Sequence, residues 1–112
     1  MTDKNWKRME RRVAKKLGGT RNPLSGSMSR HTAGDVIHDM FYVECKYRKN
    51  FSIYKWFDDV KKKASRERKI PALVLKEKNR HGELVVLQLD DFSGLVSENK
   101  SVLEGREKEE DN

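Results

Sequence analysis

Two carboxylates and a lysine are concentrated in one apolar stretch, GDVIHDMFYVECK, which covers residues 34–46. Asp35 opens the stretch after a glycine, and Glu44 and Lys46 stand two residues apart near its end. Side chains of these types can bind metals, transfer protons or stabilise developing charge. They can also be ordinary charges on a partly solvated strand, so the two hypotheses must be weighed against the rest of the chain.

The stretch predicts a β-hairpin that would bring the two carboxylates together. If Asp39-Met40 is a two-residue loop, Asp35 lies directly across from Glu44, and such Cβ atoms are about 4.5–5.5 Å apart. Lys46 shares their face because strand side chains alternate. The other face carries the apolar core side, namely Val36, His38, Phe41, Val43 and Cys45. Asp-Met is not a favoured hairpin loop, and a slip of one residue would undo the pairing.

The E-x-K pattern alone has little specificity in a chain so rich in Glu and Lys. It occurs three times, beginning at Glu44, Glu67 and Glu98. Only the first occurrence lies on an apolar strand that follows a Gly-Asp pair. That context, rather than the motif, favours a functional role.

A third carboxylate lies on the predicted first helix, residues 3–17, with Asp3 as its N-cap and Gly18-Gly19 as its stop signal. At 100° per residue, Glu10 falls inside the apolar stripe of this helix rather than opposite it. Burying an unpaired carboxylate costs several kcal/mol, so Glu10 needs a partner. It either pairs with an arginine at the edge of the stripe or serves a metal or catalytic site.

The remaining elements follow from hydrophobic periodicity and turn residues. A Gly/Ser/Asn-rich loop covers 18–33, Ser52 caps a helix at 53–68, and Pro71 marks the exit from it. Strands are expected at 35–38, 41–47, 72–78 and 84–89, with a short helix at 90–97. The order αββαββα predicts an α/β fold with a mixed central sheet flanked by helices. Residues 1–97 form a single domain, and residues 98–112 form an acidic, flexible tail.

Charge is distributed unevenly along the chain. The whole chain has a net charge of +7, whereas residues 98–112 alone carry six acids against three bases. The basic body favours a polyanionic partner, most commonly nucleic acid. The sequence shows no membrane span or signal peptide, and its single cysteine, Cys45, fits the reducing cytoplasm. A structural zinc site and a small-molecule cofactor are not expected.

Gly34-Asp35 followed by Glu44-Cys45-Lys46 resembles the core motif of the PD-(D/E)XK nucleases, with glycine in place of the proline. More narrowly, residues 5–90 resemble a Holliday junction resolvase of the archaeal or phage type. The resemblance consists of a glutamate in the first helix, here Glu10, a loop with Arg21 and Ser25-Gly26-Ser27, and the D…E-x-K hairpin.

The resemblance implies a restriction-endonuclease-like core and Mg²⁺-dependent hydrolysis of DNA, with Mn²⁺ as a substitute. Asp35 and Glu44 would be metal ligands, with the main-chain carbonyl of Cys45 as a third and Glu10 acting directly or through water. Lys46 would orient or help deprotonate the attacking water. Ser27 or Ser25, and Arg21 or Arg30, would reach the phosphate, unless the loop is only a solvated linker.

Cutting two strands symmetrically needs two active sites, so the resemblance implies a homodimer acting on branched double-stranded DNA. The DNA-binding surface would include Arg11, Lys15, Arg21, Ser25, Arg30, Arg48, Lys49 and Lys62. Two alternatives remain open. One is a related nuclease acting on flaps, ends or damaged duplex. The other is a basic nucleic-acid-binding module without catalysis, in which Asp35→Asn or Lys46→Ala would change no activity.

Overall fold

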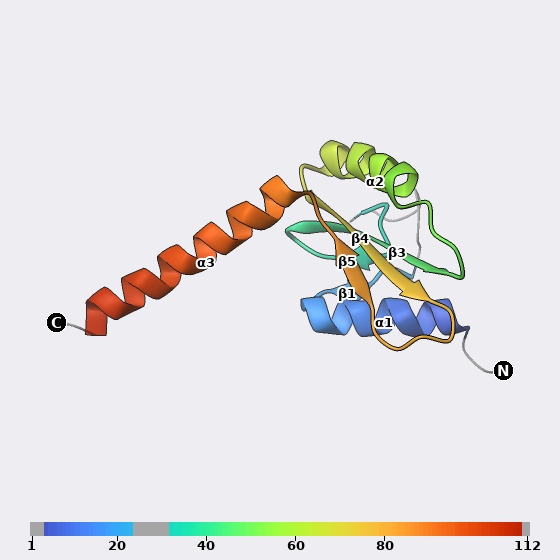
Figure 1. The fold of residues 1–112 in the computed structure, drawn as a ribbon, viewed down its shortest axis with the longest axis horizontal. Coiled ribbons are helices and arrows are strands. Elements are labelled where there is room, and N and C mark those ends of the chain that lie inside the picture. Colours follow the sequence, from blue (N-terminus) through green and yellow to red (C-terminus); the bar gives the residue numbers. More distant parts are fainter. Residues whose placement is uncertain (1–3, 24–31, 111–112) are drawn as a thin grey trace.

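A five-stranded mixed sheet forms the centre of the computed structural model, which describes residues 4–23 and 32–110 (Figure 1). The sheet order follows the chain, and β3 and β4 run parallel while all other neighbours are antiparallel. The elements are α1 (Asn5–Leu17), β1 (Thr20–Arg21), β2 (Val36–Ile37), β3 (Phe41–Arg48), α2 (Ile53–Glu67), β4 (Ile70–Glu77), β5 (Leu84–Val86) and α3 (Leu89–Glu110). The predicted α/β class with a restriction-endonuclease-like core is confirmed.

The two central strands bury both of their faces because a helix covers each side of the sheet (Figure 1). Alternation along β3 sends Val43 and Cys45 toward α1, and Tyr42 toward α2. Along β4, Val74 faces α1 and Leu73 faces α2. α2 connects the parallel pair β3 and β4, as expected for a crossover helix.

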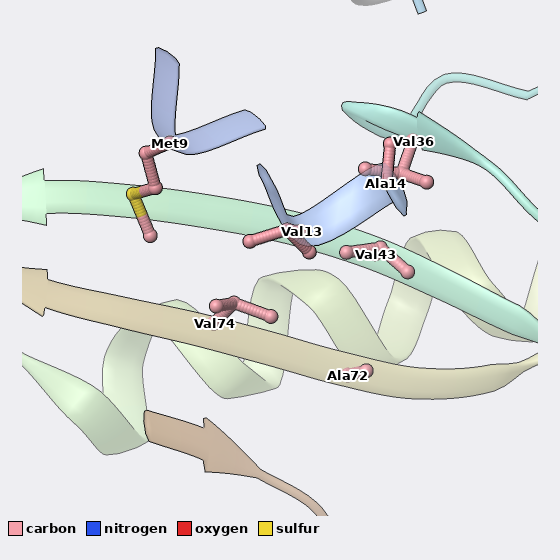
Figure 2. Packing of buried hydrophobic residues seen from close by; sticks show 7 residues of the cluster. All are labelled: Met9, Val13, Ala14, Val36, Val43, Ala72 and Val74. Carbon is pink, nitrogen blue, oxygen red and sulfur yellow. The ribbon is translucent and has the colours of Figure 1, made fainter. Parts of the chain in front are cut away.

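The core on the α1 side is made of small and branched side chains that interlock between the helix and three strands. Figure 2 shows its seven buried members, Met9, Val13, Ala14, Val36, Val43, Ala72 and Val74. The cluster fixes the roll of α1 against the sheet, and therefore fixes which way Glu10 points. The core on the α2 side contains Tyr42, Phe57, Val60, Ala64, Leu73 and Leu75.

The hairpin register predicted from the sequence is confirmed, since Val36 pairs with Val43. The unfavoured Asp39-Met40 loop is stabilised by a histidine. His38 Nδ1 accepts hydrogen bonds from the backbone N–H groups of Met40 and Phe41 at 3.0 and 3.2 Å. Its other ring nitrogen, Nε2, lies 3.0 Å from the carbonyl oxygen of Leu17. The ring thereby supplies the hydrogen bonds that stabilise this loop in place of favoured turn residues, and it connects the hairpin to the end of α1.

Several element boundaries differ from the predictions. β1 lies inside the segment predicted as loop, because a strand of two residues leaves no periodicity to detect. Pro71 is the second residue of β4 rather than a stop after α2, and β5 ends at Val86. Lys4 holds the N-cap position of α1, and Asp3 lies outside the described residues. Ser52 is the N-cap residue of α2 but makes no side-chain capping bond.

The last helix is longer than expected. α3 runs from Leu89 to Glu110 instead of ending at residue 97, so it includes most of the segment predicted to be a flexible tail. That segment contains Glu, Lys, Arg and Leu, which are good helix formers, and no proline. The helix extends away from the sheet (Figure 1). Among the described residues, none of the helices is long and apolar enough to span a membrane.

Leu73→Ala tests the core on the α2 side. Leu73 is 0% exposed in the middle of β4, so we expect the free energy of unfolding to fall by about 2–5 kcal/mol, measured by urea denaturation. Leu84→Ala is the matched control, because Leu84 is 72% exposed on β5 and should cost less than about 1 kcal/mol. Equal losses for the two variants would contradict this packing.

Candidate active site at the open edge of β3

The site lies where β3 extends past the start of β2. β2 begins at Val36, opposite Val43, so the second half of β3, residues 45–48, continues without a partner from β2. In the part of the chain that the structure describes, this half pairs with β4 alone. Side chains from both faces of the sheet can therefore meet around the free edge.

Asp35 occupies the position where the pairing stops, and hydrogen bonds fix it from three directions. Its N–H donates to the carbonyl of Val43 at 2.8 Å, and its carbonyl accepts from the N–H of Asn22 at 2.9 Å. Its side-chain Oδ2 accepts from the N–H of Cys45 at 2.8 Å. The carboxylate thus takes the place of the next strand residue and ends the ladder.

A cavity of about 300 Å³ opens beside Asp35. It brings together all four charged residues that the sequence nominated from separate elements, Glu10 from α1, Asp35 before β2, and Glu44 and Lys46 on β3. Its other lining residues are Trp6, Met9, Cys45, Tyr47 and Arg48. The arrangement therefore joins the two motifs that were separate in the sequence, the helix glutamate and the D…E-x-K hairpin.

The side chains of Asp35 and Glu44 lie half-buried and close to each other, and the pKa values of both carboxyl groups are raised. Burial, followed by the charge of Asp35, raises the pKa of Glu44 from 4.5 to about 7. Burial also raises the pKa of Asp35, although the Cys45 N–H and the positive charges of Lys46 and Arg21 oppose the shift. Negative charge in the cavity is therefore only partly compensated by the protein.

Glu10 pairs with an arginine, as one of the two hypotheses for its position on the apolar stripe expected. It is 5% exposed, and its Oε1 accepts a hydrogen bond from Arg21 Nε at 2.8 Å. Arg21 also lies over the ring of Trp6, at 5.8 Å from the centroid. Burial and the neighbouring Asp35 raise the pKa of Glu10 to about 6 despite this pair. Glu10 is thus an arginine-paired residue that also faces the other carboxylates.

The donor chemistry of the cavity suits a hard divalent cation. Oε2 of Glu44 is buried and makes no hydrogen bond to any residue that the structure describes, although burial normally requires a partner for a carboxylate oxygen. Within residues 4–23 and 32–110, no group of three or more His, Cys, Asp or Glu side chains is arranged so that it could hold a metal ion. Mg²⁺ needs fewer protein ligands, because it usually keeps several waters and binds through one or two carboxylates. Asp35 and Glu44 fit that description.

Two lysines supply positive charge at the rim of the site. Lys46 lies over the ring of Trp56, 5.5 Å from its centroid. The positive charge of Lys63, on α2, opposes the rise in pKa of both Asp35 and Glu44. Lys63 also pairs with Asp59 at 3.1 Å. Lys63 was not among the predicted site residues. No local pattern singles it out, because α2 carries four lysines and only the packing of the helix against the sheet decides which one reaches the carboxylates.

The sequence analysis also missed two residues, Asn22 and Glu67, that hold the backbone just before Asp35. The side chain of Asn22 is 1% exposed and donates to the carbonyls of Thr32 and Gly34 at 3.0 and 2.8 Å. Glu67, at the end of α2, accepts from the Thr32 hydroxyl at 2.6 Å and from the Ala33 N–H at 3.0 Å. These contacts link α2 and β1 to the segment before Asp35, and no local pattern in the sequence announces them.

Gly34 explains why the chain departs from the proline of the motif. Its N–H donates to the Thr32 hydroxyl at 3.1 Å, and a proline has no N–H to offer. A Cβ atom at this position would lie 2.8 Å from the carbonyl oxygen of Val43. Glycine is therefore required by the close approach of the hairpin strands.

The predicted DNA-binding residues are spread over several surfaces. Arg48 lines the cavity, and Arg21 is engaged by Glu10. Arg11, Lys15 and Lys49 are exposed, and Lys62 is exposed in a shallow hollow on the outer side of α2. Ser25, Ser27 and Arg30 lie outside the described residues. Their roles, like those of the other site residues, stay predictions.

Comparison with known protein families agrees with this geometry. Residues 4–110 match the model of a family described as "Phage putative PDDEXK endonuclease". The chain belongs to this family. No curated protein and no solved structure matched the chain. As a PDDEXK family member the chain is a nuclease by class, and the placement of Asp35, Glu44 and Lys46 in one cavity agrees with the motif that names the family.

Glu44→Gln tests the electrostatics of this PDDEXK site. Glu44 holds its proton more tightly in the folded state, with a pKa of about 7 against 4.5. The free energy of unfolding should therefore fall as pH rises from about 5 to 8, by at most about 1.4 kcal/mol per pH unit for each proton released. In Glu44→Gln this decrease should be smaller, as measured by urea unfolding without divalent metal.

The exposed Glu98→Gln variant is the control and should keep the wild-type pH profile. Glu10, with a pKa of about 6, contributes in the same direction in all three proteins. If wild type and Glu44→Gln show parallel stability profiles between pH 5 and 8, Glu44 is not buried against Asp35 as described.

Proposed function

We propose that this protein is a Mg²⁺-dependent endonuclease that resolves four-way DNA junctions by paired nicks in the cytoplasm of the host cell. The observation that carries the proposal is the convergence of Glu10, Asp35, Glu44 and Lys46 on one cavity at the free edge of β3. Membership in a PDDEXK endonuclease family supports the nuclease chemistry. The choice of a branched substrate rests on the resemblance to small junction resolvases and on the basic body of the chain.

The two buried carboxylates would hold the metal ion. Asp35 and Glu44 are its expected ligands, with the main-chain carbonyl of Cys45 as a third and Glu10 in direct or water-mediated contact. When bound, Mg²⁺, or Mn²⁺ in its place, supplies charge stabilisation for a phosphoryl group and lowers the pKa of water. The raised pKa of Glu44 means that this site must lose a proton before it can act as a dianionic ligand pair. Activity should consequently rise with pH around neutrality.

The remaining residues would act on the water and the phosphate. Lys46 would orient or help deprotonate the attacking water and offset charge on the scissile phosphate. Lys63 and Arg48 add positive charge at the rim. Arg21 pairs with Glu10, and Ser25, Ser27 and Arg30, which lie outside the described residues, are proposed to contact the phosphate.

A cleavage assay on labelled DNA tests the function. Purified protein should nick a four-way junction in Mg²⁺ and not in EDTA, and should act on it faster than on matched duplex or flap DNA. Asp35→Asn and Lys46→Ala should each lower the rate by about 10²- to 10⁴-fold, because each removes a group at the reacting centre. Asp39→Asn, an exposed carboxylate in the β2–β3 turn, should leave the rate unchanged.

The outcomes separate the alternatives. Preferential cutting of flaps or ends would replace the junction substrate while keeping the nuclease. Absence of Mg²⁺-dependent cutting on every substrate, with DNA binding retained, would indicate a non-catalytic binding module. Wild-type cleavage by Asp35→Asn would remove Asp35 from the site.

Paired nicks need two active sites, so we propose that the protein acts as a twofold-symmetric homodimer. α3 offers the surface for a second copy. Leu89, Phe92 and Val96 follow i, i+3, i+7 spacing on this projecting helix and are 78, 52 and 51% exposed (Figure 1). Two copies of α3 packed about a twofold axis would bury both stripes, whereas one copy leaves them in water.

The oligomeric state can be measured by light scattering after size-exclusion chromatography. We expect a dimer for wild type and a monomer for the Phe92→Ser/Val96→Ser double variant, which should still nick single strands but lose paired cutting. Tyr54→Ser, which changes a side chain 88% exposed on α2, should remain dimeric. A monomeric wild-type protein would contradict the proposal.

A further inference from the structure

A second cavity, of about 340 Å³, lies on the other side of Tyr47 from the carboxylates. Tyr47 lines both cavities and so forms the wall between them. Four cationic side chains line the second cavity, Arg8 and Arg12 from α1 and Lys76 and Arg80 from the end of β4 and its turn. The lining includes no carboxylate. Its polar, cationic character suits an anion rather than an apolar ligand.

The position of this cavity relative to the active site is fixed by contacts between α1 and the strands. Arg12 and Lys16 both bind Glu83, at 2.8 and 3.4 Å, and thereby fasten α1 to the segment before β5. Asn5 Nδ2 donates to the hydroxyl of Tyr47 at 3.2 Å. The turn itself has a defined shape, because Asn79 and Gly82 both adopt left-handed conformations. The cationic groups are therefore held on a rigid frame.

Neighbouring carboxylates neutralise only part of the positive charge of the cavity. Glu83 pairs with Arg12, and Glu77 pairs with Arg80 at 3.4 Å on the exposed surface. Lys76 donates to the carbonyl oxygen of Arg80 and lies over the Tyr47 ring, neither of which neutralises it. Arg8 makes no ion pair with any residue that the structure describes. Exposed pairs such as Arg80–Glu77 are weak and can exchange for a phosphate.

We propose that this cavity binds a backbone phosphate of the DNA substrate about one or two nucleotides from the phosphate that is cut. The inference rests on the proposed function, which places the scissile phosphate at Asp35 and Glu44. From Glu44 to Tyr47 is three residues of extended chain, roughly 10 Å at about 3.3 Å per residue. Each nucleotide advances by about 3.4 Å along the DNA axis, but the phosphates of one strand wind around that axis and are spaced more widely, so roughly 10 Å corresponds to about one or two nucleotides. Arginine binds phosphate bidentately, which suits Arg8 and Arg80 to this role.

Binding is measured separately from cleavage, by fluorescence anisotropy of a labelled four-way junction and a matched duplex in EDTA across a salt series. Arg8→Ala and Arg80→Ala should each weaken binding about five- to tenfold at 0.1 M salt and reduce the slope of log K against log[salt] by about 1. Arg8→Lys should retain the slope, because it keeps the charge. Lys61→Ala, which removes one charge from the outer side of α2, is the matched control and should have a smaller effect on both.

Both arginines are exposed, so the variants should fold, and circular dichroism melting curves verify this. Losses for Arg8→Ala and Arg80→Ala no larger than for Lys61→Ala would overturn the inference. A neutral methylphosphonate placed about one or two nucleotides from the mapped cut should weaken wild-type binding but not that of Arg8→Ala, and equal weakening of both would also overturn it. Failure of cleavage with arginine-dependent binding intact would refute the proposed function alone.

Discussion

The hydrogen bond from the Cys45 N–H to the side chain of Asp35 is the contact on which the site depends. At this point β2 ends while β3 continues, and a strand edge with an unpaired N–H would otherwise be left inside the protein. A carboxylate rather than a backbone carbonyl takes that N–H, so the ladder ends and a charged oxygen pair remains at the edge. Glu44 is placed beside it by the hairpin register, and Glu10 is placed by the packing of α1 through Met9 and Val13. Because the Asp35 carboxylate takes the place of a backbone carbonyl of β2, the same residue creates both the opening at the strand edge and the negative charge in it.

The site is held at a cost to stability. Three carboxylates share a cavity whose nearest compensating charges are an arginine and two lysines, and the pKa values of all three acids are raised. Glu44 keeps one oxygen buried without a hydrogen-bond partner among the described residues. The network of Asn22, Thr32 and Glu67 supports the chain before Asp35 with hydrogen bonds from two other elements. A divalent cation and its waters would satisfy the carboxylates of the cavity. The same carboxylates can therefore destabilise the free protein and still suit the proposed cleavage of DNA.

Acidic and basic side chains also gather in different places on the surface. Three carboxylates meet in the candidate cavity, whereas four cationic side chains from α1, β4 and the turn after β4 line the second cavity. Tyr47 separates the negative cavity from the positive one at the end of β3. A DNA strand laid along this edge would meet metal-binding groups at one phosphate and cationic groups about one or two nucleotides away. The helix α3 extends away from the sheet (Figure 1), and its exposed apolar stripe suits contact between protein chains.

Local sequence determined the chemistry of the protein. Alternation over residues 41–47 placed Glu44 and Lys46 on one face, the hairpin arithmetic placed Asp35 across from Glu44, and helical periodicity turned Glu10 inward. These are short-range relations, fixed by the 3.6- and 2-residue repeats of the backbone. What tertiary structure alone decided was how far β2 runs beside β3, since that sets where the edge opens. It also decided that Arg21 pairs with Glu10, that Lys63 reaches the carboxylates from α2, and that Glu67 holds the chain before Asp35. Those contacts join residues far apart in the chain, and no periodicity encodes them, because they depend on how helices and strands pack.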